Sequence, residues 1–482
     1  MPPEPVGARL ARNVAVLWGT RGFALGLQLV SFAILASYLG PDRFGVYAFA
    51  LAMAELLRIL PNFGFETVVT REVAQQPGRE RELVPALLHL RVLAGVVAYG
   101  LLILLVFAAG YSGKQREAAL AAGTLLVLLS IESLIVVLQV RLAMGWVAAA
   151  DMVRAVAFLV GVVALTHVDA GPVAFVWLYV AVGVIGACVA AAAALRRAEL
   201  DWRPRPRLWM PVVRAAWPIG LAGLFIALYY RIDMAFLARL KPPGDLGQYG
   251  AAYRFLETFA VLPALAMAVI APVLAQSFTQ SRQILQRRFE RAVHLVTVLV
   301  VPVAVVGGMT AWRLVPRLPG FGDYDGAGVA LSILSPAAAA LFLATIAQAV
   351  LVAAHLEGRL LRLAAFGVAV NVALNVALIP PYSYVGAAAA TAATEAAVLL
   401  LSAREVRRKL EMPWPLERFW QSLAAGAACA AALVPAYLVN PFLQVAIGLA
   451  VYAVAVVVLG TLDRDDLAGL HPFARRVQSP AQ

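Results

Sequence analysis

Residues 35–61 read LASYLGPDRFGVYAFALAMAELLRILP, and residues 237–263 repeat the same pattern as LARLKPPGDLGQYGAAYRFLETFAVLP. The two stretches align without a gap, and their identical positions include Pro41/Pro243, Gly45/Gly247 and Glu55/Glu257. Each copy is the end of one predicted helix, a turn of proline and glycine, and a new helix with an acid in an apolar run. An internal duplication in a membrane chain is typical of transporters, because two similar bundles can rock about a site held between them.

The composition is that of a membrane protein. Of the 482 residues, 62% are hydrophobic and only 14% are charged. A soluble domain cannot bury that much apolar surface. Apolar windows of about 20 residues, long enough to cross a bilayer core of about 30 Å, recur from end to end. The sequence therefore predicts an all-α polytopic membrane protein with about 14 transmembrane helices.

The distribution of basic residues predicts the topology. The fourteen expected spans are roughly 13–37, 45–66, 86–109, 118–140, 147–166, 173–195, 212–237, 249–275, 292–312, 328–353, 361–379, 384–403, 420–438 and 442–460. With the N-terminus inside, the cytoplasmic segments carry 25 basic residues and the opposite side carries 7. This bias predicts that both termini are cytoplasmic. Topology and anionic lipid thus explain the net charge of +12, and no nucleic-acid partner is expected.

The repeat predicts how the spans are grouped. The copies are 202 residues apart with six spans between them, so they have the same orientation in the membrane. We expect two six-helix lobes related by a pseudo-two-fold axis along the membrane normal, followed by a C-terminal helical hairpin. The predicted divisions are an N-terminal lobe (1–195, spans 1–6), a basic cytoplasmic connector (196–211), a C-terminal lobe (212–403, spans 7–12), and spans 13–14 with a cytoplasmic tail (404–482).

Charged residues inside the spans are the candidate functional residues. A charge at mid-membrane costs about 2.5–3.5 kcal/mol on insertion scales, so it normally faces a bundle interior or a wet cavity. Three pairs have the i,i+3 spacing that places opposite charges on one helix face: Glu55 with Arg58, Asp151 with Arg154, and Arg254 with Glu257.

Two functions for these charges stay open. Arginines could line a cavity and hold an anionic head group, because the guanidinium fork matches phosphate oxygens. Alternatively, the pairs could be interior ion pairs that lock the lobes. On the first hypothesis the substrate-binding residues are Arg21, Arg58, Arg231 and Arg254. The coupling or cavity acids are then Glu55, Asp233 and Glu257.

Asp233 is the preferred coupling acid, because a desolvated carboxylate can exchange a proton near neutral pH. Proton or Na⁺ coupling is compatible with the sequence. Four further charges lie near the ends of their spans and are expected to be interfacial anchors: Arg91, Asp151, Arg154 and Arg214.

Other chemistry is not expected. The chain has no Gly-x-x-x-x-Gly-Lys loop to power it with ATP, and its five histidines lack metal-ligand spacing. Its connections are too short to hold a catalytic domain. We therefore expect no enzyme activity, no cofactor and no metal site. Asp323 and Asp325 in a glycine-rich loop are interpreted as a turn.

Two motifs carry a family resemblance. The first is the stretch from Leu35 to Ala74, which resembles the first-repeat signature of polysaccharide and O-antigen flippases. The second is Asn371-x-x-x-Asn375-x-x-Leu378-Ile379-Pro380, followed by Gly386-Ala387-Ala388-x-Ala390-Thr391 and Glu395, which resembles the span 11–12 region of the same group. That group belongs to the multidrug/oligosaccharidyl-lipid/polysaccharide exporter superfamily.

The resemblance implies a function in polysaccharide biosynthesis. The chain would transfer an undecaprenyl-diphosphate-linked oligosaccharide from the cytoplasmic to the outer leaflet of the bacterial inner membrane by alternating access. Cavity arginines would meet the diphosphate, and a polysaccharide polymerase and glycosyltransferases would be partners. Lipid II flippases are the closest alternative, although their usual Gly-Phe-x-Arg-Asp stretch is replaced after Arg21-Gly22-Phe23 by Ala24-Leu25-Gly26. A cation-coupled multidrug exporter is the other alternative.

Overall fold

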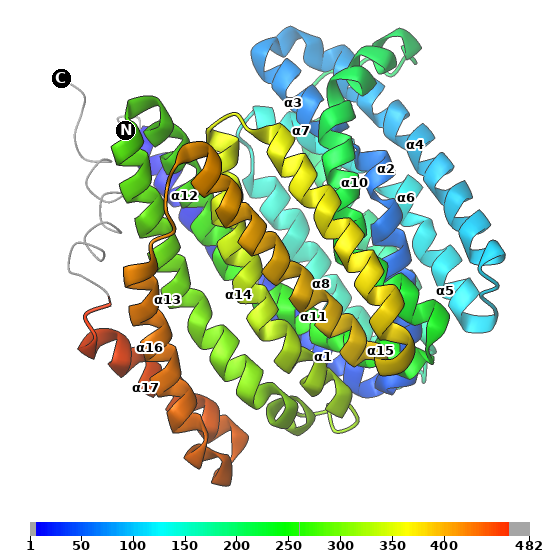
Figure 1. Ribbon diagram of the computed structural model, residues 1–482. Helices are drawn as coiled ribbons and strands as arrows, with labels where there is room; N and C mark the ends of the chain where they lie inside the picture. The colour runs from blue at the N-terminus through cyan, green and yellow to red at the C-terminus, as the bar shows by residue number, and fades with distance from the viewer. Residues whose placement is uncertain (1–5, 260, 462–482) are drawn as a thin grey trace. The chain divides into compact units, whose positions relative to one another are not determined.

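The computed structural model of the protein describes residues 6–259 and 261–461 (Figure 1). Every regular element in these residues is helical, which confirms the predicted all-α class. The chain's internal contacts divide it into two compact units, residues 1–247 and 248–482. The predicted lobe boundaries at 195 and 212 remain a prediction.

The first unit contains both long helices and short helical segments. Its α-helices are α1 (Val6–Leu57), α2 (Ile59–Asn62), α3 (Phe65–Gln75), α4 (Glu80–Ala108), α5 (Gly113–Gly123), α6 (Leu125–Leu128), α7 (Ile135–Val140), α8 (Gly145–His167), α9 (Pro172–Leu195) and α10 (Trp209–Leu240). Its 3₁₀ turns are η1 (Pro77–Arg79), η2 (Leu129–Leu134) and η3 (Pro206–Leu208).

The second unit contains most of α11, which begins in the first unit and spans Pro243–Phe259. The later helices are α12 (Val261–Gln280), α13 (Arg282–Leu314), α14 (Asp325–Ala353), α15 (Glu357–Leu410), α16 (Leu416–Leu433) and α17 (Pro441–Val458). The 3₁₀ turns η4 (Val315–Arg317) and η5 (Pro435–Leu438) join neighbouring helices.

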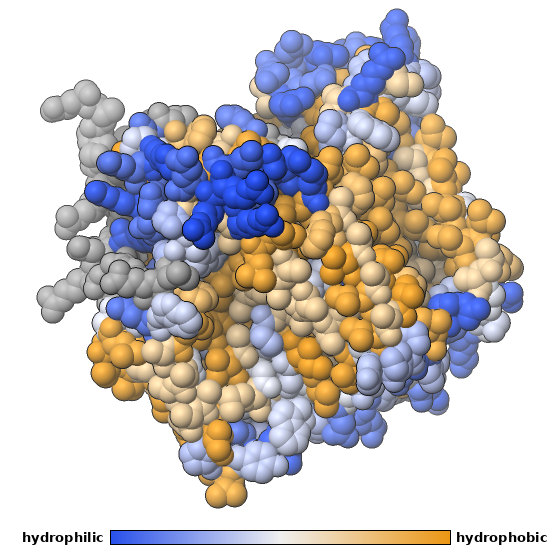
Figure 2. Space-filling view, viewed as in Figure 1, coloured by the Kyte–Doolittle hydropathy of each residue, from blue (hydrophilic) through white to orange (hydrophobic). Residues whose placement is uncertain are grey.

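The helices match the expected number of spans. Eleven helical segments in the described residues are long and apolar enough to cross a membrane. Two of them, Gly22–Gln75 and Gly358–Leu410, are about twice the required length and contain a non-helical residue. The α11–α12 pair adds one more candidate, so about fourteen spans are present. Many apolar side chains of these helices are exposed, as lipid-facing surfaces require, and they form much of the visible surface in Figure 2.

Two residues with positive φ divide the longest helices. Gly40 has φ 66° and ψ 170°, a conformation that only glycine adopts readily, and it separates the first two spans of α1. Ser383 has φ 51° and ψ −131° and separates the two halves of α15. Each residue follows or precedes a proline-containing stretch that cannot continue a regular helix.

Small residues bring the two halves of α15 together. A methyl group on Gly386 would overlap the carbonyl oxygen of Leu378 and lie 2.6 Å from its carbon. Ala387, Ala388 and Ala390 are fully buried beside it. This confirms the close packing expected of small residues between membrane helices. The buried Asn375 donates to Asn371 Oδ1 at 2.8 Å, so these two amides bond to each other along one helix face.

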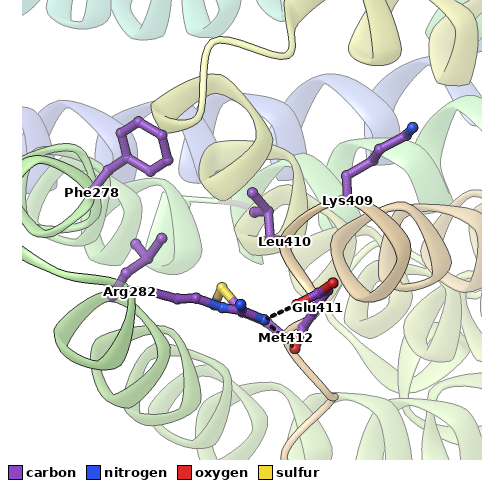
Figure 3. Close-up of a pocket in the computed structure, with 7 residues that line it drawn as sticks. Phe278, Arg282, Lys409, Leu410, Glu411 and Met412 are labelled. Carbon is purple, nitrogen blue, oxygen red and sulfur yellow. Dashed lines mark hydrogen bonds and ion pairs between the residues drawn. The ribbon is translucent and has the colours of Figure 1, made fainter.

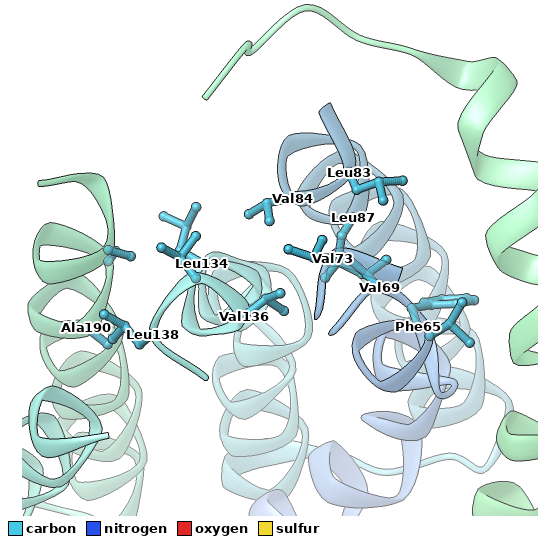
Figure 4. Close-up of a cluster of buried hydrophobic side chains, with 14 of the residues drawn as sticks. Phe65, Val69, Val73, Leu83, Val84, Leu87, Leu134, Val136, Leu138 and Ala190 are labelled. Atoms are coloured by element: carbon cyan, nitrogen blue, oxygen red, sulfur yellow. The ribbon is translucent and has the colours of Figure 1, made fainter. Parts of the chain in front are cut away.

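An apolar cluster packs several elements of the first unit together (Figure 4). It joins α3, α4, η2, α7 and α9 through Phe65, Val69, Val73, Leu83, Val84, Leu87, Leu134, Val136, Leu138 and Ala190. These side chains are almost entirely buried. Because close packing makes the cluster rigid, it holds the polar residues of α3, α4 and η2 in fixed positions.

The basic connector is attached to the first unit. The Asp201 backbone N–H donates to the Arg81 carbonyl at 2.9 Å, and Arg205 pairs with both Asp201 and Glu82. The Arg203 N–H and the Arg205 guanidinium donate to the Asp201 carboxylate and hold its pKa below the ordinary value. The connector is therefore bonded to the first turns of α4 rather than being a free tether.

The contact at Gly386 generates the first prediction. Gly386→Ala would force two packed backbones apart, and overpacking of this kind costs about 1–3 kcal/mol. We expect a lower midpoint of thermal unfolding for the purified protein in detergent. Gly358→Ala on the same helix is the control, because its new methyl group meets no atom within 4 Å. Equal midpoints for the two variants would contradict the prediction.

Candidate functional site

Five charged side chains form a continuous chain of ion pairs in the first unit. Arg58 Nη1 lies 3.2 Å from Glu55 Oε1, and Arg58 Nη2 lies 3.3 Å from Glu132 Oε2. The other oxygen of Glu132 lies 2.9 Å from Arg154 Nη2, and Arg154 Nη1 lies 3.6 Å from Asp151. Two of the three i,i+3 pairs expected from the sequence are present here, and Glu132 links them. We call these five residues the Glu132 network.

The Glu132 network lies where two spans leave α-helical geometry. Arg58, between α1 and α2, keeps helical φ and ψ of −60° and −20°, and the second span breaks a few residues later at Gly64, where φ is 75°. Glu132 lies in η2, a 3₁₀ stretch inside the fourth span. Irregular backbone at membrane depth is tolerated only where it is buried in protein or lines a wet cavity. The breaks and the charges therefore belong to one polar region.

A glycine makes room for the arginine of α8. A methyl group on Gly186 of α9 would overlap Arg154 Cγ and Nε and lie 2.7 Å from its Cδ. The Arg154 stem therefore passes directly over the α9 backbone. This packing holds the guanidinium against Glu132.

Arg91 of α4 is the centre of a second polar group in the same region. Its side chain is only 3% exposed, with Nη1 3.4 Å from Glu66 and Nη2 2.5 Å from Asn62 Oδ1. Gln139 of α7 donates to Glu66 at 3.0 Å and accepts from Thr70 at 3.1 Å. Polar side chains from α2, α3, α4 and α7 thus replace water around a buried guanidinium.

The expectation that Arg91 is an interfacial anchor is wrong, and the same expectation for Arg154 stays a prediction. Arg91 is buried, and Arg154 is held by Glu132. Proximity to a span end in the sequence did not leave the Arg91 side chain exposed, because neighbouring spans enclose it. Glu132 was not among the predicted site residues; an isolated acid in the apolar run LLSIESLIVV was the signal that could have identified it.

The second copy of the repeat carries a separate ion pair. Arg254 Nη1 on α11 lies 3.2 Å from Glu257 Oε2, as the i,i+3 spacing predicted. The exposed fractions are 45% for Arg254 and 32% for Glu257, compared with 33% for Arg58 and 34% for Glu55. Both repeat-associated pairs are therefore only partly shielded.

The remaining predicted residues have different surroundings. Asp233 on α10 is buried, and its Oδ1 accepts the Met234 N–H at 2.7 Å, whereas Arg231 is half-buried. The different burial agrees with the expectation that residues two apart on a helix face different ways. The side chain of Arg21 lies outside the part of the protein that the structure describes.

A pocket of about 230 Å³ lies in the second unit, where α15 ends (Figure 3). It is lined by Phe278, Arg282, Leu285, Lys409, Leu410, Glu411 and Met412. Arg282 pairs with the Glu411 carboxylate at 2.8 Å and donates to its carbonyl at 3.1 Å, and Lys409 extends away from this pair.

The geometry permits two kinds of chemistry in the Glu132 network. The partly exposed Arg58 can exchange a carboxylate partner for another anion. The acids could also bind a cation, because the Glu132 network and the Arg91–Glu66 pair together hold four carboxylates and three guanidiniums.

Comparisons with known proteins point to a transporter fold. The model of the family described as polysaccharide biosynthesis protein matches residues 10–278. A solved structure of the lipid II flippase MurJ in an inward closed conformation has a TM-score of 0.78 at 12% identity, and covers 92% of this chain and 98% of that chain. No curated protein matches by sequence.

Two further structures share the fold. An inward-facing multidrug resistance transporter of the MATE family, in the MOP superfamily, has a TM-score of 0.62 at 15% identity, covering 80% of this chain and 94% of that chain. A MOP superfamily transporter from Pyrococcus furiosus, described as having a binding pocket of reverse polarity, has a TM-score of 0.51 at 14% identity, covering 84% and 95%. At these identities the likeness establishes the fold and not the substrate.

The shared carboxylate generates a stability prediction. Glu132→Gln would leave Arg58 and Arg154 with a neutral amide between them, and we expect a loss of about 3 kcal/mol, the lower end for a broken buried pair, because Arg58 stays partly exposed. The measurement is thermal unfolding in one detergent. The control Glu72→Gln breaks the more exposed pair with Arg79 and should cost less than about 1 kcal/mol.

Another prediction concerns the close contact between Gly186 and Arg154. Gly186→Ala should displace Arg154 and weaken its bond to Glu132, so the variant should unfold at a lower temperature than Gly183→Ala on the same helix. A new methyl group at Gly183 makes only ordinary contacts, at 3.5 Å or more. In a double-mutant cycle, Gly186→Ala and Glu132→Gln should be less than additive by about 0.5–3 kcal/mol, because both break one interaction. Full additivity would disprove the link.

Proposed function

The chain belongs to the polysaccharide biosynthesis protein family, and from that premise we propose that it moves an undecaprenyl-diphosphate-linked oligosaccharide from the cytoplasmic to the outer leaflet. The observation that carries the proposal is the family match over residues 10–278, which includes both copies of the repeat. The membrane transporter fold supports movement of a substrate across the bilayer by alternating access. The work of the protein is then transport, not bond chemistry.

The arginines of the repeat-associated pairs would hold the diphosphate. Arg58 and Arg254 are each paired with an acid, and each keeps a third or more of its side chain exposed. A phosphate can therefore reach the guanidinium and replace Glu55 or Glu257 as its partner. Arg21 and Arg231 would add to the same cationic surface. The sugars would occupy the water-filled cavity, and the prenyl tail would stay in the lipid bilayer.

Exchange of partners offers a route to coupling. A carboxylate displaced from its arginine loses the positive charge that keeps it ionised, so it binds a proton or Na⁺ more readily. Glu55, Glu257 and the buried Asp233 are the proposed coupling acids. Substrate and cation would thus be linked through the same side chains.

The proposed setting is the bacterial inner membrane with both termini in the cytoplasm. The supporting observation is the 25-to-7 bias of basic residues. The six-helix lobes over 1–195 and 212–403 would move relative to each other, so that the protein alternates between inward-facing and outward-facing conformations. Glycosyltransferases would supply the lipid-linked glycan, and a polysaccharide polymerase would consume it.

Lipid II is the second candidate substrate. The observation that favours it is the TM-score of 0.78 to a lipid II flippase. Both substrates present a polyprenyl diphosphate to the protein, so the arginines would have the same role. The two differ in the glycan, which a direct comparison of both lipids in one assay resolves.

The test is lipid flipping in proteoliposomes. We expect the wild-type protein to expose a lectin-binding undecaprenyl-diphosphate oligosaccharide at the far leaflet faster than protein-free vesicles do. Arg58→Ala or Arg254→Ala should slow flipping by about tenfold or more, which corresponds to losing one charged hydrogen bond to phosphate, and lysine should partly restore it.

Matched variants separate binding from folding. Glu132→Gln weakens the same ion-pair network but keeps the Arg58 guanidinium, so it should flip faster than Arg58→Ala. Arg79→Ala, at an exposed pair with Glu72, should match the wild type. Normal flipping by both Arg58→Ala and Arg254→Ala would disprove the role of these arginines. Absence of flipping by the wild type for either lipid would disprove the function.

A further inference from the structure

The two copies of the repeat touch each other through equivalent glycines. A methyl group on Gly45 would overlap the Pro243 carbonyl, 2.7 Å from its carbon, and would lie 3.1 Å from Gly247 N. A methyl group on Gly247 would overlap the Pro41 carbonyl, 2.8 Å from its carbon, and would lie 3.1 Å from Gly45 N. The contact is thus reciprocal, and all four residues lie within residues 1–247.

The sequence explains why the contact is reciprocal. Pro41 and Pro243 are equivalent in the repeat, as are Gly45 and Gly247. Each proline begins a helical segment, after Gly40 in the first copy and at the start of α11 in the second. Each glycine is buried and faces the first-turn carbonyl of the other copy. A local two-fold relation between the copies is the geometry that produces such a pair of contacts.

The atoms nearest to each glycine in this contact are backbone atoms of the other copy. Glycines allow helix backbones to approach closely in membranes, where Cα–H groups can face carbonyl oxygens. Each such contact contributes about 0.5–1 kcal/mol. The crossing is therefore specific in shape but weak enough to separate, unlike the multiply bonded Glu132 network.

One side chain distinguishes the two copies at this crossing. The Asp42 Oδ1 atom lies 2.5 Å from the position that a methyl group on Gly244 would occupy. The equivalent residue in the second copy is Gly244 itself, so the carboxylate lies over the first turn of α11 with no counterpart in the other direction. A carboxylate near a helix N-terminus is stabilising, so Asp42 adds to the closed contact.

We propose that this crossing, which we call the glycine clasp, is a conformational device that holds the two repeat copies together at one end of the molecule and opens during transport. The inference rests on the proposed alternating-access function. The charge bias assigns residues 38–44 and 238–248 to the outer side, so the clasp closes the outer end and its separation opens that end. Gly45 and Gly247 set how tightly the copies close.

The test measures the distance across the clasp. Cysteines for spin labels replace Arg43 and Asp245, two equivalent positions beside the crossing, in a background with Cys188→Ser and Cys429→Ala. In nanodiscs without substrate we expect the wild-type background to show a short-distance population. Gly45→Ala or Gly247→Ala should reduce that population by about fivefold or more, and the double variant should not restore it.

The controls use a glycine of the same helix. Gly26→Ala on α1 meets no atom within 4 Å and should leave the distances unchanged. The clasp is disproved if Gly45→Ala and Gly247→Ala keep the wild-type distances. Distances are measured without substrate, so they remain informative even if the wild type flips neither lipid and the proposed function fails.

A second measurement applies if the alanine variants do not fold. Hydrogen exchange of the wild-type protein is followed in peptides spanning 41–47 and 243–247, with and without undecaprenyl diphosphate. Opening of the clasp by this ligand should change exchange in both peptides together, because the contact is reciprocal. Exchange that changes in one peptide alone, or in neither, would disprove a clasp that opens during transport.

Discussion

The structure depends on how it neutralises charge inside a membrane. An arginine or glutamate in hydrocarbon must find partners within the protein, because lipid offers none. In the first unit the solution is a carboxylate shared between two guanidiniums: one oxygen of Glu132 faces Arg58 and the other faces Arg154. This arrangement ties the second, fourth and fifth spans together. The shape of the polar region follows from it.

The sharing of Glu132 requires departures from ideal helices. Arg58 lies shortly before the break at Gly64, and Glu132 lies in a 3₁₀ stretch. Gly186 removes the side chain that would otherwise occupy the path of Arg154. The neighbouring apolar cluster of Phe65, Leu83 and Leu134 cannot move freely, so the breaks are fixed in place. Local irregularity and rigid packing act together to form one polar site.

Local patterns in the sequence predicted more than distant ones. Hydropathy gave the helical spans, and i,i+3 spacing gave the pairs at Arg58, Arg154 and Arg254, because both depend on residues close in the chain. The bridge from Arg58 to Glu132 joins residues 74 apart, and its existence depends on how spans pack. Burial of Arg91 has the same origin. The functional roles of the charges remain proposals, since pairing alone does not separate a ligand site from an interior ion pair.

The repeat copies share an acid but differ in how they neutralise it. Glu55 and Glu257 are equivalent, yet the arginine follows the acid in the first copy and precedes it in the second. Ala52 and Ala260 occupy the positions that the arginine of the other copy would require. Duplication therefore preserved the acid and a neighbouring arginine while reversing the direction of the pair along the helix.

The balance of charges in the first unit determines how an anionic ligand could be bound. In the first unit Arg58, Arg91 and Arg154 already face four carboxylates, so the region has no surplus of positive charge. A diphosphate would be bound by replacing a carboxylate and not by adding to an empty cationic site. Its affinity would then depend on where the displaced carboxylate goes and whether a cation accompanies it. Binding and coupling would be one electrostatic event, carried by the acids as much as by the arginines.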